Sequence, residues 1–150
     1  MRRGRPNLAL LRRMGAEAME CGAFVDWFAR THQDLLPALT HIPNERRNKL
    51  EAIRMQLMGV RKGVADYLLA VPRGAFPGMW LEFKAAGQSL SAVSQDQRTW
   101  LRLMAAAGFF TAVARGVDQA IEITEAYLAE GVTEAHWYRA ERYLRAQEAR

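Results

Sequence analysis

The residues of this chain that are best suited to chemistry are two carboxylates and one lysine, Asp66, Glu82 and Lys84. Carboxylate oxygens are hard ligands that suit a divalent cation, and a nearby ammonium group can offset charge on an attacked phosphate. Metal-assisted hydrolysis of a phosphodiester requires such a set. Whether the three side chains meet depends on the segment between Asp66 and Glu82.

That segment predicts a β-hairpin, with an apolar run, a turn that contains glycine and proline, and a returning strand. Side chains alternate between the two faces of a strand, so Glu82 and Lys84 share one face. Asp66 then lies across the hairpin from Glu82, and the Phe83 carbonyl offers another oxygen to the same metal ion. A strand with one solvated face is the simpler interpretation of an isolated Glu-x-Lys; the pairing with Asp66 favours a site.

A basic loop that contains a glycine leads into Asp66. Arg61 and Lys62 supply positive charge, and Gly63 lets the backbone approach a phosphate closely. Taken alone, the loop is equally typical of a polar turn before a strand. The carboxylates and the lysine that follow it favour the functional interpretation.

Four other polar side chains are candidates for the same site. Gln97, in a helix that opens at Ser94, fits a plain surface residue; the functional interpretation places it over the carboxylates, where it would hydrogen-bond the attacking water or the phosphate. Glu17 and Glu20 are three residues apart and so share one face of a predicted helix, where glutamates are usually solvated. His41 fits a structural, hydrogen-bonded histidine as well as a substrate contact.

Positive charge gathers around the predicted hairpin. Between Arg46 and Lys84 there are eight basic and three acidic residues, whereas residues 116–150 contain seven acidic and four basic ones. A phosphate-rich polymer is a natural partner for such a field, although an ordinary solvated basic face would explain the charge alone. The basic residues expected to contact phosphates are Arg46, Arg47, Arg61, Lys62 and Arg73.

Composition narrows the class of protein. At 150 residues and 50% hydrophobic, the chain predicts one domain with one core. The single cysteine excludes an intrachain disulfide, and the three histidines lack zinc-hydrolase spacing. No apolar stretch is long enough to cross a bilayer, and the run 8–11 is too short for a signal-peptide core. We expect a cytoplasmic protein.

Hydrophobic periodicity and turn residues predict a mixed α/β fold, in which a small mixed sheet with a central hairpin is flanked by helices. The predicted helices cover 15–32, 47–58, 94–107, 118–129 and 133–145, and the predicted strands cover 39–42, 67–72, 79–84 and 109–114.

Several short motifs, taken in order, resemble the virus-type replication-repair nuclease (VRR-NUC) domain of the PD-(D/E)XK nuclease superfamily. The resemblance runs from about Glu17 to Leu128. The family usually has a proline before the aspartate; Ala65 stands there in this chain, which relaxes the turn but removes no ligand. The motifs are His41-Ile-Pro-Asn44, Gly59-Val-Arg-Lys-Gly-Val-Ala-Asp66, Val71-Pro-Arg-Gly74, Leu81-Glu-Phe-Lys84, Ser94 to Trp100 with Gln97, and Gly116-Val-Asp-Gln-Ala-Ile121.

The resemblance implies a restriction-endonuclease-like core and a deoxyribonuclease that depends on Mg²⁺ or Mn²⁺. It implies Asp66 and Glu82 as metal ligands, Lys84 as a catalytic residue and Gln97 as a supporting one. A glutamate of the first helix completes the family site, and by its distance from Phe24-Val25-Asp26-Trp27 we favour Glu17 over Glu20. His41 and Asn44 fall in a motif that we expect to contact DNA.

Stand-alone family members resemble Holliday-junction resolvases, so the resemblance implies branched DNA as the substrate, a role in DNA repair and a phage or prophage source. A DNA-binding or assembly protein without turnover, and a single-strand or restriction-like nuclease, are the alternatives. We expect one domain over 1–150, with a core of about 17–129 and an extra helix over 133–145. A four-way junction needs two symmetric cuts, which predicts a homodimer. Its interface would use Trp80, Trp137, Tyr138, Tyr143 and Leu144, unless these side chains pack on their own core.

Overall fold

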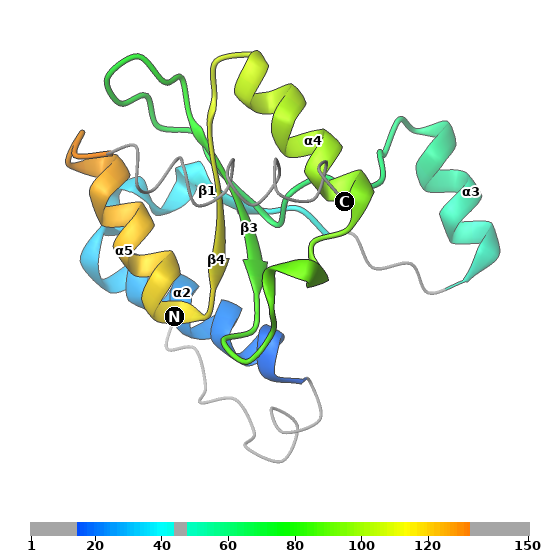
Figure 1. The fold of residues 1–150 in the computed structure, drawn as a ribbon, viewed down its shortest axis with the longest axis horizontal. Helices are drawn as coiled ribbons and strands as arrows, with labels where there is room; N and C mark the ends of the chain where they lie inside the picture. The colour runs from blue at the N-terminus through cyan, green and yellow to red at the C-terminus, as the bar shows by residue number, and fades with distance from the viewer. Residues whose placement is uncertain (1–14, 44–47, 133–150) are drawn as a thin grey trace.

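The computed structural model describes residues 15–43 and 48–132. At its centre lies a four-stranded sheet in the order β1-β2-β3-β4 (Figure 1). β1 pairs antiparallel with β2, β2 pairs antiparallel with β3, and β3 pairs parallel with β4, so the sheet is mixed. The strands are β1 (Leu39–His41), β2 (Tyr67–Leu69), β3 (Met79–Lys84) and β4 (Phe110–Arg115).

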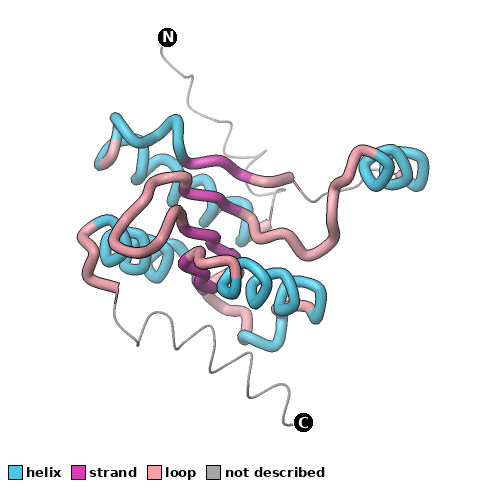
Figure 2. Tube along the Cα trace, turned by 90° about the horizontal axis from the view of Figure 1, so that it is seen from above, coloured by secondary structure: helices cyan, strands magenta, loops and turns pink. Residues whose placement is uncertain are grey.

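Helices lie on both sides of this sheet (Figure 2). α2 and α5 pack together against one face, α4 packs against β4, and α3 stands apart (Figure 1). The predicted mixed α/β fold is confirmed, while the predicted helix over 133–145 lies outside the described residues. No described helix has both the length and the apolar character needed to cross a membrane. The helices are α2 (Ala16–Thr31), α3 (Lys49–Leu57), α4 (Gln95–Ala106) and α5 (Val117–Leu128), with short 3-10 helices η1 (Gln33–Ala38) and η2 (Leu90–Ala92).

The predicted hairpin is present, with a first strand that is shorter than the apolar run. The pairing of Tyr67 with Leu81 sets the register between β2 and β3. After Leu69 the chain leaves the sheet ladder, and the carbonyl of Val71 accepts a hydrogen bond from the Tyr127 hydroxyl at 2.7 Å. Beyond β2, a side chain of α5 therefore supplies the hydrogen-bond donor for the Val71 carbonyl.

β3 is buried on both faces because helices cover both sides of the sheet. Leu81 and Phe83 lie in the core that is shared with α2 and α5, whereas Trp80 packs edge-on against Trp100 of α4 at a centroid distance of 5.5 Å. Glu82 is fully buried in the same strand. The interpretation of this strand as one with a solvated face is therefore wrong, and Trp80 packs within its own chain rather than on an open surface.

Replacing Tyr127 by phenylalanine should destabilise the fold. The ring and its stacking on Phe110 remain, but the buried carbonyl of Val71 loses its donor. We expect the free energy of unfolding in urea to fall by about 1–2 kcal/mol. Leu103→Ala, on the exposed side of α4, is the control and should change stability by less than about 0.5 kcal/mol. A loss no larger than that of the control would show that the hydrogen bond contributes little.

Candidate active site

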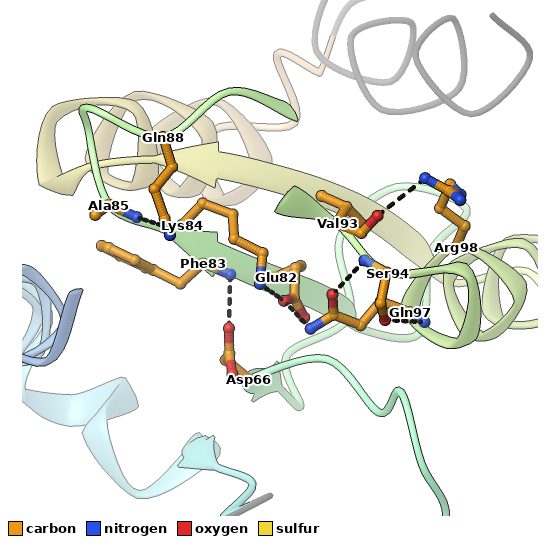
Figure 3. A network of polar contacts seen from close by, with 10 residues as sticks. All are labelled: Asp66, Glu82, Phe83, Lys84, Ala85, Gln88, Val93, Ser94, Gln97 and Arg98. Atoms are coloured by element: carbon orange, nitrogen blue, oxygen red, sulfur yellow. Dashed lines mark hydrogen bonds and ion pairs between the residues drawn. The ribbon is translucent and has the colours of Figure 1, made fainter. Parts of the chain in front are cut away.

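Asp66, Glu82 and Lys84 meet beside the hairpin (Figure 3). Asp66 lies at the entrance to β2, and its Oδ2 accepts a hydrogen bond from the backbone N–H of Phe83 at 2.8 Å. On the preceding residue of β3, the Oε1 atom of Glu82 lies 2.8 Å from Nζ of Lys84. The backbone carbonyl of Asp66 accepts from the N–H of Ile42 at 2.7 Å, so both neighbouring strands fix its position.

Gln97 reaches this cluster from the first turn of α4. Ser94 caps the helix: its hydroxyl accepts from the Gln97 N–H at 3.2 Å, and the Gln97 side-chain oxygen accepts from the Ser94 N–H at 2.8 Å. The capping box therefore fixes the amide so that its oxygen faces the start of the helix and its nitrogen points away from it. That nitrogen donates to Oε1 of Glu82. The sequence predicted Gln97 above the carboxylates; its bond to Glu82 was not anticipated.

Gly63 is required at its position by the packing of α4. Its φ is +79°, and a Cβ atom there would lie 2.4 Å from the backbone carbonyl of Asp96 and 2.7 Å from the Gln97 nitrogen. The close approach that the sequence assigned to a phosphate is thus an approach to the helix that holds Gln97. The loop before Asp66 and the start of α4 position each other.

The two candidate glutamates of α2 have different surroundings. Oε2 of Glu20 accepts a hydrogen bond from the backbone N–H of Ala86 at 3.0 Å, which joins α2 to the loop after β3. Glu17 interacts electrostatically with Lys84 and Asp66, and with the backbone of Ala85. Of the two, Glu17 is the one that faces the cluster, while Glu20 holds a loop.

The cluster has more negative than positive charge. Burial raises the pKa of Glu17 and of Asp66, and the Lys84 ammonium offsets part of this effect. Burial, with the neighbouring charge of Asp66, raises the pKa of Glu82 from 4.5 to about 7. Burial lowers the pKa of Lys84, but the ion pair with Glu82 and the other two carboxylates outweigh it, and the net shift is upward. Three carboxylates therefore share one cation.

This donor set suits a hard divalent cation. Oε2 of Glu82 is buried and has no hydrogen-bond partner, although buried polar atoms nearly always have one. Asp66 supplies a second carboxylate, and Phe83 enters the site through its N–H while its carbonyl remains a predicted ligand. Within residues 15–43 and 48–132, no three histidine, cysteine or acidic side chains are already arranged as a closed ligand set. The chemistry of the donors fits Mg²⁺ or Mn²⁺ better than zinc.

The structure brings only some of the predicted DNA contacts to the site. Arg61 and Lys62 are exposed in the loop that leads to Asp66, and His41 is exposed at the end of β1, with its ring centroid 5.1 Å from that of Tyr67. Asn44, Arg46 and Arg47 lie outside the described residues.

Arg73 lies at the other end of the hairpin, away from these residues. Its Nε donates to the carbonyl of Leu128 at 2.9 Å and its Nη1 donates to the carbonyl of Pro72 at 2.8 Å. The side chain thereby joins the hairpin turn to the end of α5. The structure does not bring Arg73 together with the basic residues near Asp66.

An open groove extends from the carboxylates along α2, and sequence reasoning did not foresee it. Its volume is about 1300 Å³. The Cys21 thiol and the Tyr67 hydroxyl are hydrogen-bonded in its wall, and burial raises the pKa of Cys21 to about 11. Small residues along α2 were the only sequence signal for this groove. The lining side chains used below are Glu17, Val25, Asp26, Ala29, Leu36, Leu39 and Asp66.

Comparisons with known proteins place this chain in one family. The model of the VRR-NUC domain family matches residues 2–118. A solved structure of a VRR-NUC domain protein superposes with a TM-score of 0.67 and 25% sequence identity, over 77% of this chain and 89% of that one. A comparison with curated proteins found no match. The chain belongs to the VRR-NUC domain family, which has a nuclease-type fold.

Glu82 should make stability depend on pH. Because its pKa is raised, between pH 4.5 and about 7 the folded chain keeps a proton that the unfolded chain has lost. The contribution of Glu82 to stability must therefore fall as pH rises through that window. In EDTA, wild type should lose up to about 3 kcal/mol of unfolding free energy relative to Glu82→Gln across it.

Urea unfolding of both proteins at each pH measures the difference and removes the effect of other titrating groups. Lys84 keeps its charge throughout the window, because its pKa is raised from 10.5. A difference that stays constant, or that grows in favour of wild type as pH rises, would contradict the assignment.

Proposed function

We propose that this protein is a structure-selective endonuclease that hydrolyses phosphodiester bonds in branched DNA, such as Holliday junctions, with Mg²⁺ or Mn²⁺. One observation supports the proposal most directly: a fully buried glutamate, Glu82, keeps one oxygen without a partner beside a second carboxylate and a lysine. A buried charge in this state is costly unless a cation binds it.

Each residue of the cluster has its own role in the proposed reaction. Asp66 and Glu82 would hold the metal ion, and a glutamate of α2, Glu17, would complete the set. When bound, such an ion polarises the phosphate and lowers the pKa of water. Lys84 places its ammonium group where charge develops on the attacked phosphate. Gln97 holds Oε1 of Glu82 and so keeps Oε2 directed away from α4.

The basic loop before Asp66 would bring the DNA backbone to this cluster. Arg61 and Lys62 are exposed there, and Arg46 and Arg47 belong to the same basic stretch of sequence. The described backbone around Arg61 and Lys62 is a turn rather than a helix that could enter a groove, so we infer that these residues contact phosphates rather than base edges. We propose that it acts in the cytoplasm of a bacterium or of a phage-infected host.

We also propose that the protein acts as a homodimer. A four-way junction has two strands to cut at symmetric positions, and each chain has one cluster of Asp66, Glu82 and Lys84. A two-fold dimer presents two such clusters with matching symmetry.

Cleavage should require a divalent cation and each residue of the cluster. Asp66→Asn, Glu82→Gln, Lys84→Met and Glu17→Gln should each slow cutting of a labelled four-way junction by a factor of about 10² to 10³, because each removes one positioned group. Binding to the junction in Ca²⁺ should be kept. EDTA should stop the reaction, and Mg²⁺ or Mn²⁺ should restore it.

Asp118→Asn is the matched control, since this exposed carboxylate lies on α5, outside the cluster. Cutting in EDTA, or full activity of Asp66→Asn, would contradict the metal mechanism. Full activity of Glu17→Gln together with an inactive, folded Glu20→Gln would reassign the α2 ligand. Binding without any cutting under all metals would favour the non-catalytic alternative.

DNA affinity should depend on salt through the loop residues. Removing one phosphate contact reduces the slope of log affinity against log salt by about one. Arg61→Ala and Lys62→Ala should each do so, equally for DNA of unrelated sequences, in fluorescence anisotropy titrations with Ca²⁺. Arg30→Ala should not, because Arg30 is paired with Asp26 on α2. Strong preference for one base sequence at physiological salt would contradict contacts made to phosphates alone.

A further inference from the structure

α3 is a projecting arm between β1 and β2. Among the described residues it has no extended packing against another helix or strand, and both views show it apart from the sheet and the other helices (Figures 1 and 2). The stem of the arm is closed by the hydrogen bond from the Ile42 N–H to the Asp66 carbonyl. The arm therefore starts directly beside the candidate active site.

One face of the arm is apolar and exposed. Leu50, Ile53 and Leu57 are 76%, 53% and 84% exposed, and they recur every three or four residues, so they form one stripe. On the other side of the helix, Ala52 and Met55 are half-buried. An exposed apolar stripe on an ordered helix is the usual mark of a protein-docking surface.

Charge argues against pairing two such stripes with each other. With about 3.6 residues per turn, Lys49 and Arg54 fall on opposite edges of the stripe. Two copies of α3 side by side would bring four cations together at the rim of one small contact. A nine-residue helix is also too short to bury the roughly 1,200–2,000 Å² of a stable interface by itself.

The groove along α2 has an apolar lining and acidic residues, which a binding site for the arm would need. Its middle and far part is apolar, with Val25 and Ala29 from α2 facing Leu36 and Leu39. Its charged lining is acidic apart from His41: Glu17 and Asp66 lie at one end, and Asp26 lies on the solvent edge, paired with Arg30. The apolar stripe of the arm matches the apolar lining of this groove, and a cation at the edge of the stripe can face the Asp26 carboxylate, of which one oxygen is paired with Arg30.

Gly22 supports a close approach to this groove from outside. It lies in the interior of α2 and lines the groove, where glycine weakens a helix. A Cβ atom at this position would meet no heavy atom within 4 Å, so packing within the described chain does not require a glycine. A helix of another molecule that crosses α2 here would require one.

We propose that α3 of one copy docks in the α2 groove of a second copy, and that the exchange is reciprocal. Two arms in two grooves double the buried area and satisfy two-fold symmetry. Each arm covers Gly22, Val25 and Ala29 and leaves the Glu17 and Asp66 end open. The proposal rests on the proposed homodimer and defines its interface.

The test measures the mass of the full chain by light scattering, with four variants. Wild type should have twice the mass of the 17.0 kDa chain. Ile53→Glu, which damages only the arm, and Gly22→Gln, which fills only the groove, should each halve that mass. Leu103→Glu and Ala23→Gln are the matched controls, exposed and outside both surfaces, and should remain dimers. Circular dichroism checks that every variant is folded.

Mixing the two damaged variants separates arm exchange from other modes. One intact arm and one intact groove remain in a mixed pair, so the mixture should show a weak dimer that neither variant forms alone. A monomeric wild type would overturn the proposal. So would a Gly22→Gln protein that stays dimeric, which would mean that the arms pair with each other or elsewhere.

If Ile53→Glu keeps the wild-type mass but loses junction binding, the arm contacts DNA and the proposal is wrong. Cutting is assayed separately with Mg²⁺ on the same proteins. An arm-dependent dimer that never cuts DNA would support the interface and contradict the nuclease assignment. An active nuclease whose mass is unchanged by the arm variant and by the groove variant would support the nuclease assignment and contradict the interface.

Discussion

A carboxylate at Glu82, buried on the central strand, is the constraint around which the site is built. Burying an ionised carboxylate is costly, and the fold offsets the cost with the Lys84 ammonium and the Gln97 amide. Both partners bind the same oxygen, and the other oxygen is left without one. The cluster thus keeps one buried carboxylate oxygen that no described group of the protein satisfies.

The contacts that position the Glu82 carboxylate also join separate elements of the fold. Gln97 caps α4 with its oxygen and binds Glu82 with its nitrogen, so one side chain stabilises both the start of the helix and the site. Gly63 lets the loop before Asp66 pack directly on the first turn of that helix. Through its bond to Ala86, Glu20 joins α2 to the end of β3.

Charge is divided between surfaces that face different partners. The site and the adjoining groove are acidic, which suits a divalent cation at one end and a basic helix along the rest. Arg61 and Lys62 are exposed in the loop that leads to Asp66. In the proposed dimeric nuclease, the stretch between β1 and β2 would supply both the charge for a phosphate backbone and the apolar arm for a second subunit.

Local patterns in the sequence were enough to predict most of the elements and the three side chains that meet in the cluster. Asp66, Glu82 and Lys84 follow from residue type and from strand alternation, and Ser94 marks the start of α4, because hairpin register and capping act over a few residues. Contacts between distant segments were not predictable in this way. The packing of the helices on the sheet determined four such features: the burial of Glu82, the different surroundings of Glu17 and Glu20, the remote position of Arg73 and the isolation of α3. Tertiary packing sets which side chains lose water and which partners replace it, and no local pattern encodes that.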